Sequence, residues 1–134
     1  MSPDREVVIL SFARTPMARL NGGLSSLSAA SLGAVAIRGA LARAGVDPSE
    51  VDQVLMGQVV QAGAGQNPAR QAAVQADIPW TVPATTVNKV CLSGLTAIID
   101  AARMIRLGEA SVVVAGGQES MSQAPHLLPG SRRG

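Results

Sequence analysis

Aromatic residues are almost absent from this sequence of 134 residues, which contains Phe12, Trp80 and no tyrosine. Basic stripes interleaved with aromatic side chains are typical of nucleic-acid binding, and none occurs here, so no nucleic-acid partner is expected. Hydrophobic residues nevertheless make up 47% of the chain. The core must therefore be built from Val, Ile, Leu and Ala, which suits a buried parallel sheet covered by helices. So much apolar surface also suggests that another chain or domain covers part of it.

Cysteine and histidine each occur once, as Cys91 and His126. One cysteine cannot form an internal disulfide, which fits a reducing compartment and predicts a cytoplasmic protein. One cysteine and one histidine cannot make a zinc site, so no metal is expected. The start of the chain lacks the apolar region and cleavage site of a signal peptide, and no apolar run approaches the ~20 residues that span a bilayer. We therefore expect no membrane partner.

Lysine is also scarce, since Lys89 is the only one among 11 basic residues. The arginines are scattered along the chain, apart from the pair Arg132 and Arg133. The formal net charge is +2, a balance that can help to attract an anionic substrate.

Apolar runs and helical periodicity alternate along the chain. The pattern predicts four strands separated by three helices: strands at Val7–Phe12, Val54–Val60, Ala84–Val87 and Ser111–Ala115, and helices at about 28–44, 67–76 and 93–107. This βαβαβαβ order predicts an α/β fold with a mostly parallel sheet, right-handed crossovers and helices on its faces. We expect ligands to bind beyond the carboxyl ends of the strands.

Capping residues mark the predicted helix ends. Ser28 is expected to cap the first helix and Gly45 to end it, Gly108 is expected to end the third helix, and Gly116 and Gly117 are expected to end the last strand. Gly63 and Gly65 precede the second helix and could suggest a phosphate cradle, but the pattern lacks the third glycine of a dinucleotide fingerprint and the lysine of a P-loop. A loop followed by Asn67 as the N-cap is the preferred interpretation.

Cys91 follows the third predicted strand and precedes the third helix, so it is expected at a sharp strand-to-helix turn. Ser93 is either the N-cap or a residue of the first helical turn, and Gly94 allows close approach to a neighbour. Unpaired N–H groups and the helix dipole would stabilise the thiolate there and favour nucleophilic catalysis. We therefore expect faster alkylation than for a free thiol. The alternative is a buried structural cysteine.

The segment Asn88-Lys89-Val90-Cys91-Leu92-Ser93-Gly94-Leu95-Thr96-Ala97 resembles the nucleophile motif of the thiolases, the acetyl-CoA acetyltransferase family. Other segments resemble the same family in the same order: residues 13–16 (Ala-Arg-Thr-Pro), 65–72, 115–122 and 124–126. By this resemblance, Cys91 matches the cysteine that carries the acyl group.

The resemblance implies a thiolase-like fold, of which this chain would be the N-terminal part. Residues 1–117 would form the α/β domain and residues 118–134 the start of the loop domain. In the five-layered thiolase fold, the first and fourth predicted strands would be central and the helix 93–107 would be buried. It also implies a homo-oligomer, dimer or tetramer, that pairs through about residues 84–90.

The resemblance also implies an acyltransferase that joins two acetyl-CoA molecules to acetoacetyl-CoA, or cleaves 3-ketoacyl-CoA with free CoA. Coenzyme A and acetyl-CoA would be substrates, with no permanently bound cofactor. Cys91 would hold the acyl group as a thioester, and backbone N–H groups, including its own, would hold the oxyanion.

The chain departs from the family pattern in its downstream residues. Thiolases place the activating histidine in a Gly-His-Pro segment and a second cysteine in a Cys-x-Gly-Gly-Gly segment, and neither segment occurs here. His126 matches a loop position. We therefore interpret the chain as an N-terminal thiolase fragment. The alternatives are a related condensing enzyme, such as a ketoacyl synthase, and a non-catalytic folding or dimerisation module.

Overall fold

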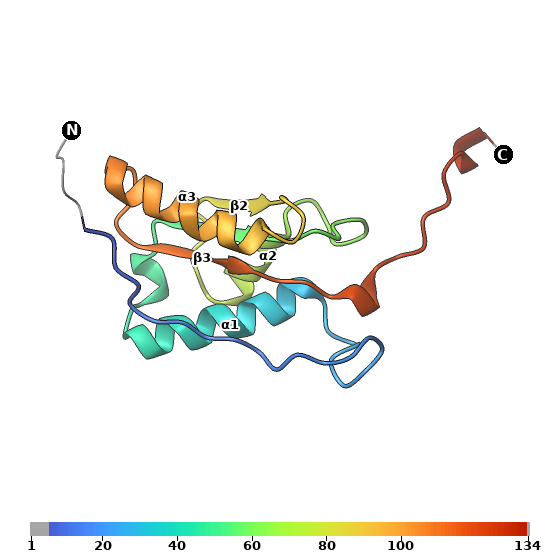
Figure 1. Ribbon diagram of the computed structural model, residues 1–134, viewed down its shortest axis with the longest axis horizontal. Coiled ribbons are helices and arrows are strands. Elements are labelled where there is room, and N and C mark those ends of the chain that lie inside the picture. Colours follow the sequence, from blue (N-terminus) through green and yellow to red (C-terminus); the bar gives the residue numbers. More distant parts are fainter. Residues whose placement is uncertain (1–5, 134) are drawn as a thin grey trace.

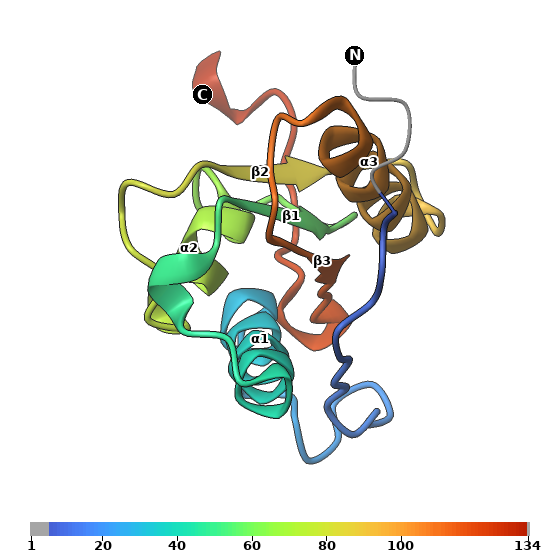
Figure 2. The same ribbon diagram turned by 90° about the vertical axis from the view of Figure 1, so that its left-hand side faces the viewer.

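The computed structural model describes residues 6–133, which form a small parallel sheet with helices on both faces (Figures 1 and 2). The elements follow the order α1 (Ala29–Ala44), η1 (Pro48–Glu50), β1 (Gln53–Gly57), α2 (Pro68–Gln75), β2 (Ala84–Val87), α3 (Ser93–Leu107), β3 (Val113–Gly117), η2 (Met121–Gln123) and η3 (Ser131–Arg133). The strand order is β2-β1-β3, and both pairings are parallel. The predicted α/β class is thus confirmed.

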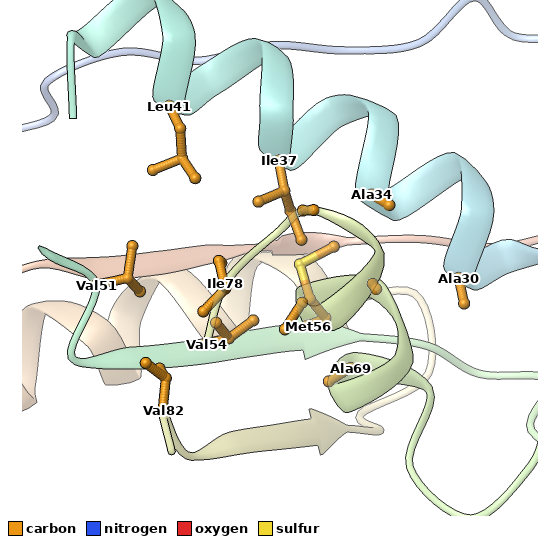
Figure 3. Packing of buried hydrophobic residues seen from close by; sticks show 13 residues of the cluster. Ala30, Ala34, Ile37, Leu41, Val51, Val54, Met56, Ala69, Ile78 and Val82 are labelled. Carbon is orange, nitrogen blue, oxygen red and sulfur yellow. The ribbon is translucent and has the colours of Figure 1, made fainter. Parts of the chain in front are cut away.

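Successive side chains of the central strand β1 point to opposite faces of the sheet, and each face has its own core. Val54 and Met56 belong to the larger cluster, with residues of α1 and α2 (Figure 3). Leu55 points the other way and packs with Ala97 and Ala101 of α3. The β1 residues from Val54 to Gly57 are buried, which explains why this segment has an unbroken apolar sequence.

Small side chains let α2 approach the sheet and α1 closely. Ala69, Ala72, Ala73 and Ala76 are all fully buried. Aliphatic side chains of α1 fill the remaining space, among them Ile37 and Leu41 (Figure 3). The aromatic-poor composition therefore gives the aliphatic core that the sequence predicts.

The predicted helix ends are confirmed in detail. Ser28 caps α1 by accepting a hydrogen bond from the N–H of Ser31, and Gly45 ends the helix with φ 66°. Asn67 caps α2 by accepting from the N–H of Arg70. Gly108 ends α3 with φ 77°, a left-handed conformation that suits glycine.

The prediction of a first strand at Val7–Phe12 is wrong. The segment has no regular secondary structure and runs beside α1, where Ser11 Oγ donates to the carbonyl oxygen of Ala40 at 2.5 Å and Arg43 donates to that of Phe12 at 2.8 Å. Within residues 6–133 no strand pairs with its backbone, and Ile9 and Phe12 are each 78% exposed. An apolar run of this kind needs cover on both faces, and here it has α1 on one side only.

The missing strand changes the sheet that the family resemblance implied. The sheet has three strands instead of four among the described residues. Its centre is β1, the second predicted strand, and β3, the fourth predicted strand, lies at an edge. The expectation of central first and fourth strands is therefore wrong for this chain, because the segment that would flank β3 does not pair with it.

The bounds of β1 and β3 also differ from the prediction. β1 ends at Gly57 instead of Val60, because the N–H groups of Val59 and Val60 turn to the carboxylate of Glu119 at 2.8 and 3.2 Å. Gly116 and Gly117, expected to end the last strand, are part of β3 and pair with Met56 and Gly57. Glycine weakens a strand but allows another backbone to come close.

Asp52 joins the amino ends of β1 and β3. Its Oδ2 atom accepts hydrogen bonds from the N–H groups of Ser111 at 2.7 Å and Val112 at 3.0 Å. The bond from Val112, followed by the one from Ser111, lowers the pKa of the Asp52 carboxyl below its usual value, because both bonds favour the charged form.

The face of α3 that points away from the sheet is open, contrary to the buried position that the resemblance implied. Leu95, Ile98 and Ile99 on this helix are 53%, 44% and 41% exposed. Within residues 6–133, none of the helices is both long enough and apolar enough to cross a bilayer.

Candidate active site

Cys91 lies in the turn between β2 and α3, at the carboxyl edge of the sheet, as the sequence predicts (Figure 1). Its side chain is exposed and forms no disulfide. The alternative of a buried structural cysteine is therefore wrong for this chain. A thiol in this place can meet a ligand that approaches the carboxyl ends of the strands.

The turn holds Val90 in a left-handed conformation with φ 52°, which is strained for a β-branched residue. Its N–H donates to Asn88 Oδ1 at 3.1 Å, and its carbonyl oxygen accepts from Ser93 Oγ at 2.6 Å. Ser93 Oγ also accepts from the N–H of Lys89 at 2.8 Å. These bonds hold the residues on both sides of Cys91.

Ser93 is the first residue of α3, and Leu92 is the N-cap, without a side-chain hydrogen bond. Of the two roles left open for Ser93, the first-turn position is correct. Ser93 is buried and its hydroxyl closes the turn by the two bonds described above.

Of the backbone N–H groups near the Cys91 thiol, some donate hydrogen bonds within the turn and one does not. Those of Leu92 and Ser93 donate to the carbonyl oxygens of Lys89 and Val90, at 3.1 Å each. Within residues 6–133, no acceptor meets hydrogen-bond geometry for the N–H of Cys91. The thiol also lies just before the N-terminus of α3, where the helix dipole favours negative charge.

Three glycines bring α3 into direct backbone contact with the sheet. A Cβ atom on Gly57 would lie 2.6 Å from the N atom of Gly94 and from the carbonyl carbon of Ser93. A Cβ atom on Gly117 would lie 3.4 Å from Cα of Gly94. We call Gly57, Gly94 and Gly117 the glycine junction. It sets the start of α3, and with it the turn that carries Cys91, directly on the ends of β1 and β3.

Two buried glutamines, which no sequence motif indicated, follow β1 and β3. Gln58 and Gln118 are 2% and 8% exposed. Gln118 Nε2 donates to Gln58 Oε1 at 2.9 Å and to the carbonyl oxygen of Pro68 at 3.2 Å, so the pair ties the carboxyl ends of the strands to α2. The available signal was a polar residue directly after each buried strand.

Internal hydrogen bonds hold the Gly63–Gly65 loop and the start of α2. The Asn67 side chain caps α2 and donates to the carbonyl oxygen of Ala84 at 2.9 Å, and Thr86 Oγ1 donates to Asn67 Oδ1 at 2.8 Å. Gln71 Nε2 donates to the carbonyl oxygen of Ala64 at 2.8 Å. The loop and the helix start are thus bonded internally, as the preferred interpretation predicts.

His126 does not lie in the body of the fold. It is exposed, in the segment after η2 that extends away from the sheet (Figure 1). A cavity of about 290 Å³ is lined by residues 15–20, 24–25, 32 and 119–122, and neither Cys91 nor His126 is among them. Among residues 6–133, no three His, Cys, Asp or Glu side chains gather where they could hold a metal ion.

Comparison with known proteins identifies the family to which this architecture belongs. The family described as "Thiolase, N-terminal domain" matches residues 7–134. An acetyl-CoA acetyltransferase from Cupriavidus necator is 59% identical over 129 residues, which are 96% of this chain and 33% of that protein. A cytosolic acetyl-CoA acetyltransferase from Gibberella zeae is 57% identical over 128 residues, which are 96% of this chain and 32% of that protein.

A solved structure agrees with these sequence matches. The crystal structure of a thiolase from Ascaris suum in complex with coenzyme A has a TM-score of 0.89 and 44% identity, covering 90% of this chain and 32% of that one. The chain thus spans about a third of the length of the relatives that it matches. The thiolase-like fold predicted from residues 88–97 and the other motifs is confirmed, and the chain belongs to the thiolase family.

Proposed function

We propose that Cys91 is the nucleophile of a thiolase-type acyl transfer, in which it accepts an acetyl group from acetyl-CoA. The observation that carries the proposal is the exposed thiol at the strand-to-helix turn, directly before α3 and at the carboxyl edge of a parallel sheet. The names of the relatives support acetyl-CoA as the substrate.

The acylation step follows from the groups at the turn. The Cys91 thiolate attacks the carbonyl carbon of the thioester, and a new C–S bond forms. The developing oxyanion accepts a hydrogen bond from the N–H of Cys91, which has no other acceptor among the described residues. The bond between the acyl carbon and the CoA sulfur then breaks, and CoA takes up the proton that the Cys91 thiol gave up through solvent.

Condensation of two acetyl-CoA molecules, or thiolysis of a 3-ketoacyl-CoA, needs more groups than this chain supplies. A base must accept a proton from within ~3 Å, or through one water. The one histidine, His126, lies in the extended C-terminal segment, and the one cysteine is the nucleophile itself. We propose that the chain contributes the acyl-carrying part of the reaction. The family match favours a thiolase over the ketoacyl synthase alternative.

The test is acylation of the purified chain by acetyl-CoA, followed by intact mass and peptide mapping. The expected result is one acetyl group on Cys91, released by hydroxylamine as a thioester is, and absent from Cys91→Ala. Lys89 is the neighbouring competitor, and an acetyl group on its amine would resist hydroxylamine. Label on Lys89 alone, or equal label in Cys91→Ala, would contradict the proposal and favour the non-catalytic module.

We also propose that the chain forms a homo-oligomer through β2. This strand lies at one edge of the sheet, and within residues 6–133 no strand pairs with its second side, where Asn67 Nδ2 donates to the carbonyl oxygen of Ala84. The rest of that side is left for a second copy. The exposed apolar face of α3 supports the same proposal, because a partner would cover it.

The expected result is a dimer or larger species in sedimentation velocity at micromolar concentration. Thr85 is exposed on β2, and Thr85→Lys is expected to shift the chain toward monomer by adding charge to the edge. Ser111→Lys, an exposed position outside β2, is the matched control and should sediment like the unchanged chain. A monomer in all three samples would argue against pairing through β2.

We further propose a cytoplasmic location and a domain division at residue 117, with residues 118–134 beginning a loop domain. A cytosolic relative supports the location. The change from β3 to irregular backbone after Gly117 supports the division.

A further inference from the structure

We propose that Glu119 is a positioning residue for Cys91, acting through the loop after β1 and through Asn88. The inference rests on the proposed role of Cys91 as the nucleophile. It concerns a residue whose carboxylate organises the backbone on which the turn that carries Cys91 rests.

Glu119 extends the sheet's bonding beyond the last ladder hydrogen bonds. The N–H of Gln118 donates to the carbonyl oxygen of Gly57 at 2.9 Å, which continues the β1–β3 pairing by one step. The next residue, Glu119, then accepts from two successive N–H groups, those of Val59 at 2.8 Å and Val60 at 3.2 Å. Bonds from N–H groups to a carboxylate are stronger than those between neutral groups, so this clamp fixes the course of the loop.

The clamped loop in turn contacts the nucleophile turn. The N–H of Gln58 donates to the carbonyl oxygen of Val87 at 3.0 Å, and the Asn88 side-chain amide lies 3.5 Å from the carbonyl oxygen of Val59. Asn88 Oδ1 accepts from the N–H of Val90 at 3.1 Å. Asn88 therefore touches the clamped loop with one end of its amide and the strained residue before Cys91 with the other.

The strain at Val90 makes this support necessary. A β-branched residue with positive φ is strained and persists only where its neighbours hold it. If Glu119 is lost, the Val59 and Val60 N–H groups lose their acceptor, and the loop keeps only the neutral bonds of Gln58 Nε2 to the Val60 carbonyl oxygen and of Gln61 Nε2 to the Gln58 carbonyl oxygen, at 2.8 Å each. The contact of Asn88 with Val59 then weakens, and the bond from Ser93 Oγ is left to hold Val90. Val90 therefore leaves its strained conformation more often, which displaces the thiol from the start of α3.

Asp52 supplies a matched control at the other end of the same strand. Its carboxylate also accepts from two successive N–H groups, those of Ser111 and Val112, and joins the same two strands. It lies before β1, at the amino ends of the strands, away from the nucleophile turn. A general loss of stability should therefore appear in variants of both carboxylates, whereas a positioning effect should appear only in variants of Glu119.

The experiment measures the second-order rate of Cys91 alkylation by iodoacetamide in the folded chain, divided by the rate for the same variant unfolded in urea. Glu119→Ala is expected to lower this ratio by roughly two- to thirtyfold, the range seen when residues that couple two sites are changed. Glu119→Gln keeps one acceptor oxygen and should give an intermediate ratio. Asp52→Asn should keep the ratio of the unchanged chain, even if its unfolding midpoint falls as far as that of Glu119→Ala.

A double-mutant cycle distinguishes a positioning role of Glu119 from a merely structural one. Asn88→Ala should lower the ratio, and Glu119→Ala combined with Asn88→Ala should lower it little further, because both act on one path. An unchanged ratio in Glu119→Ala, or an equal loss in Asp52→Asn, would overturn the inference. If Glu119→Ala does not fold, Glu119→Gln and Asn88→Ala decide by the same comparison. Because alkylation needs no acyl-CoA, failure of the acetylation test leaves this result readable.

Discussion

The purified 134-residue chain, given acetyl-CoA, is expected to release no more than about one equivalent of CoA per chain and then to stop, because the proposed nucleophile Cys91 has no second cysteine and no placed histidine to complete the reaction. Return of the acyl group to a second substrate needs a proton acceptor and a proton donor within reach of the reacting atoms. His126 lies in the segment that extends from the sheet, and among the described residues no second cysteine accompanies Cys91. The chain should therefore stall as the acetyl-thioester.

This result is measured by chromatography of CoA over time, together with the loss of acetoacetyl-CoA in the thiolysis direction. Cys91→Ala should release no CoA above the background of buffer alone, and His126→Ala should behave like the unchanged chain. Sustained release that disappears in Cys91→Ala would contradict the prediction. It would mean that residues of this chain supply the acid–base steps that the structure does not bring together.

Gly57→Ala is expected to destabilise the fold by about 3 kcal/mol, at the upper end of the usual cost of overpacking. Ala itself suits a strand here, because Gly57 has no positive φ. Its Cβ atom, however, would lie 2.6 Å from the backbone of Ser93 and Gly94 and 2.7 Å from Cβ of Ser93. Backbone atoms cannot rotate away as a flexible side chain can, so α3 or β1 must shift.

The measurement is urea unfolding followed by circular dichroism, with Gly23→Ala as the matched control. A Cβ atom on Gly23 would meet nothing within 4 Å, and this residue is not among the positive-φ glycines. The control should change the free energy of unfolding by less than about 0.5 kcal/mol. If Gly57→Ala loses as little as Gly23→Ala, then α3 does not contact the sheet as tightly as the structure shows.

Local signals in the sequence predicted much of the helical structure. Ser28, Asn67 and Gly108 act through short-range backbone chemistry, namely a side-chain oxygen that meets a nearby N–H or a glycine that adopts positive φ. Such effects need no knowledge of the rest of the fold, so they are readable from a few residues. The place of Cys91 at a strand-to-helix turn was predicted for the same reason.

The errors concern groups whose partners lie far away in the sequence. Val7–Phe12 has the apolar pattern of a strand, yet a strand also needs a neighbour to pair with, which composition does not reveal. Gly116 and Gly117 were expected to end a strand, but they are retained in β3, where Gly117 meets α3 without a Cβ atom. The contacts of Glu119 with Val59 and Val60 span about 60 positions, so no local pattern predicts them.

The glycine junction fixes the start of α3 on the sheet, whereas the rest of the helix can change its distance from the sheet. Because main-chain atoms meet there without intervening side chains, the height of the helix start above the sheet does not depend on side-chain volume. Further along α3, spacing is set by Ala97 and Ala101 against Leu55, so changes of volume at those positions tilt the far end of the helix about its start. Substitutions at these positions, by evolution or by design, can therefore move the exposed apolar surface of α3 to fit a partner, while the Cys91 thiol keeps its place at the start of the helix.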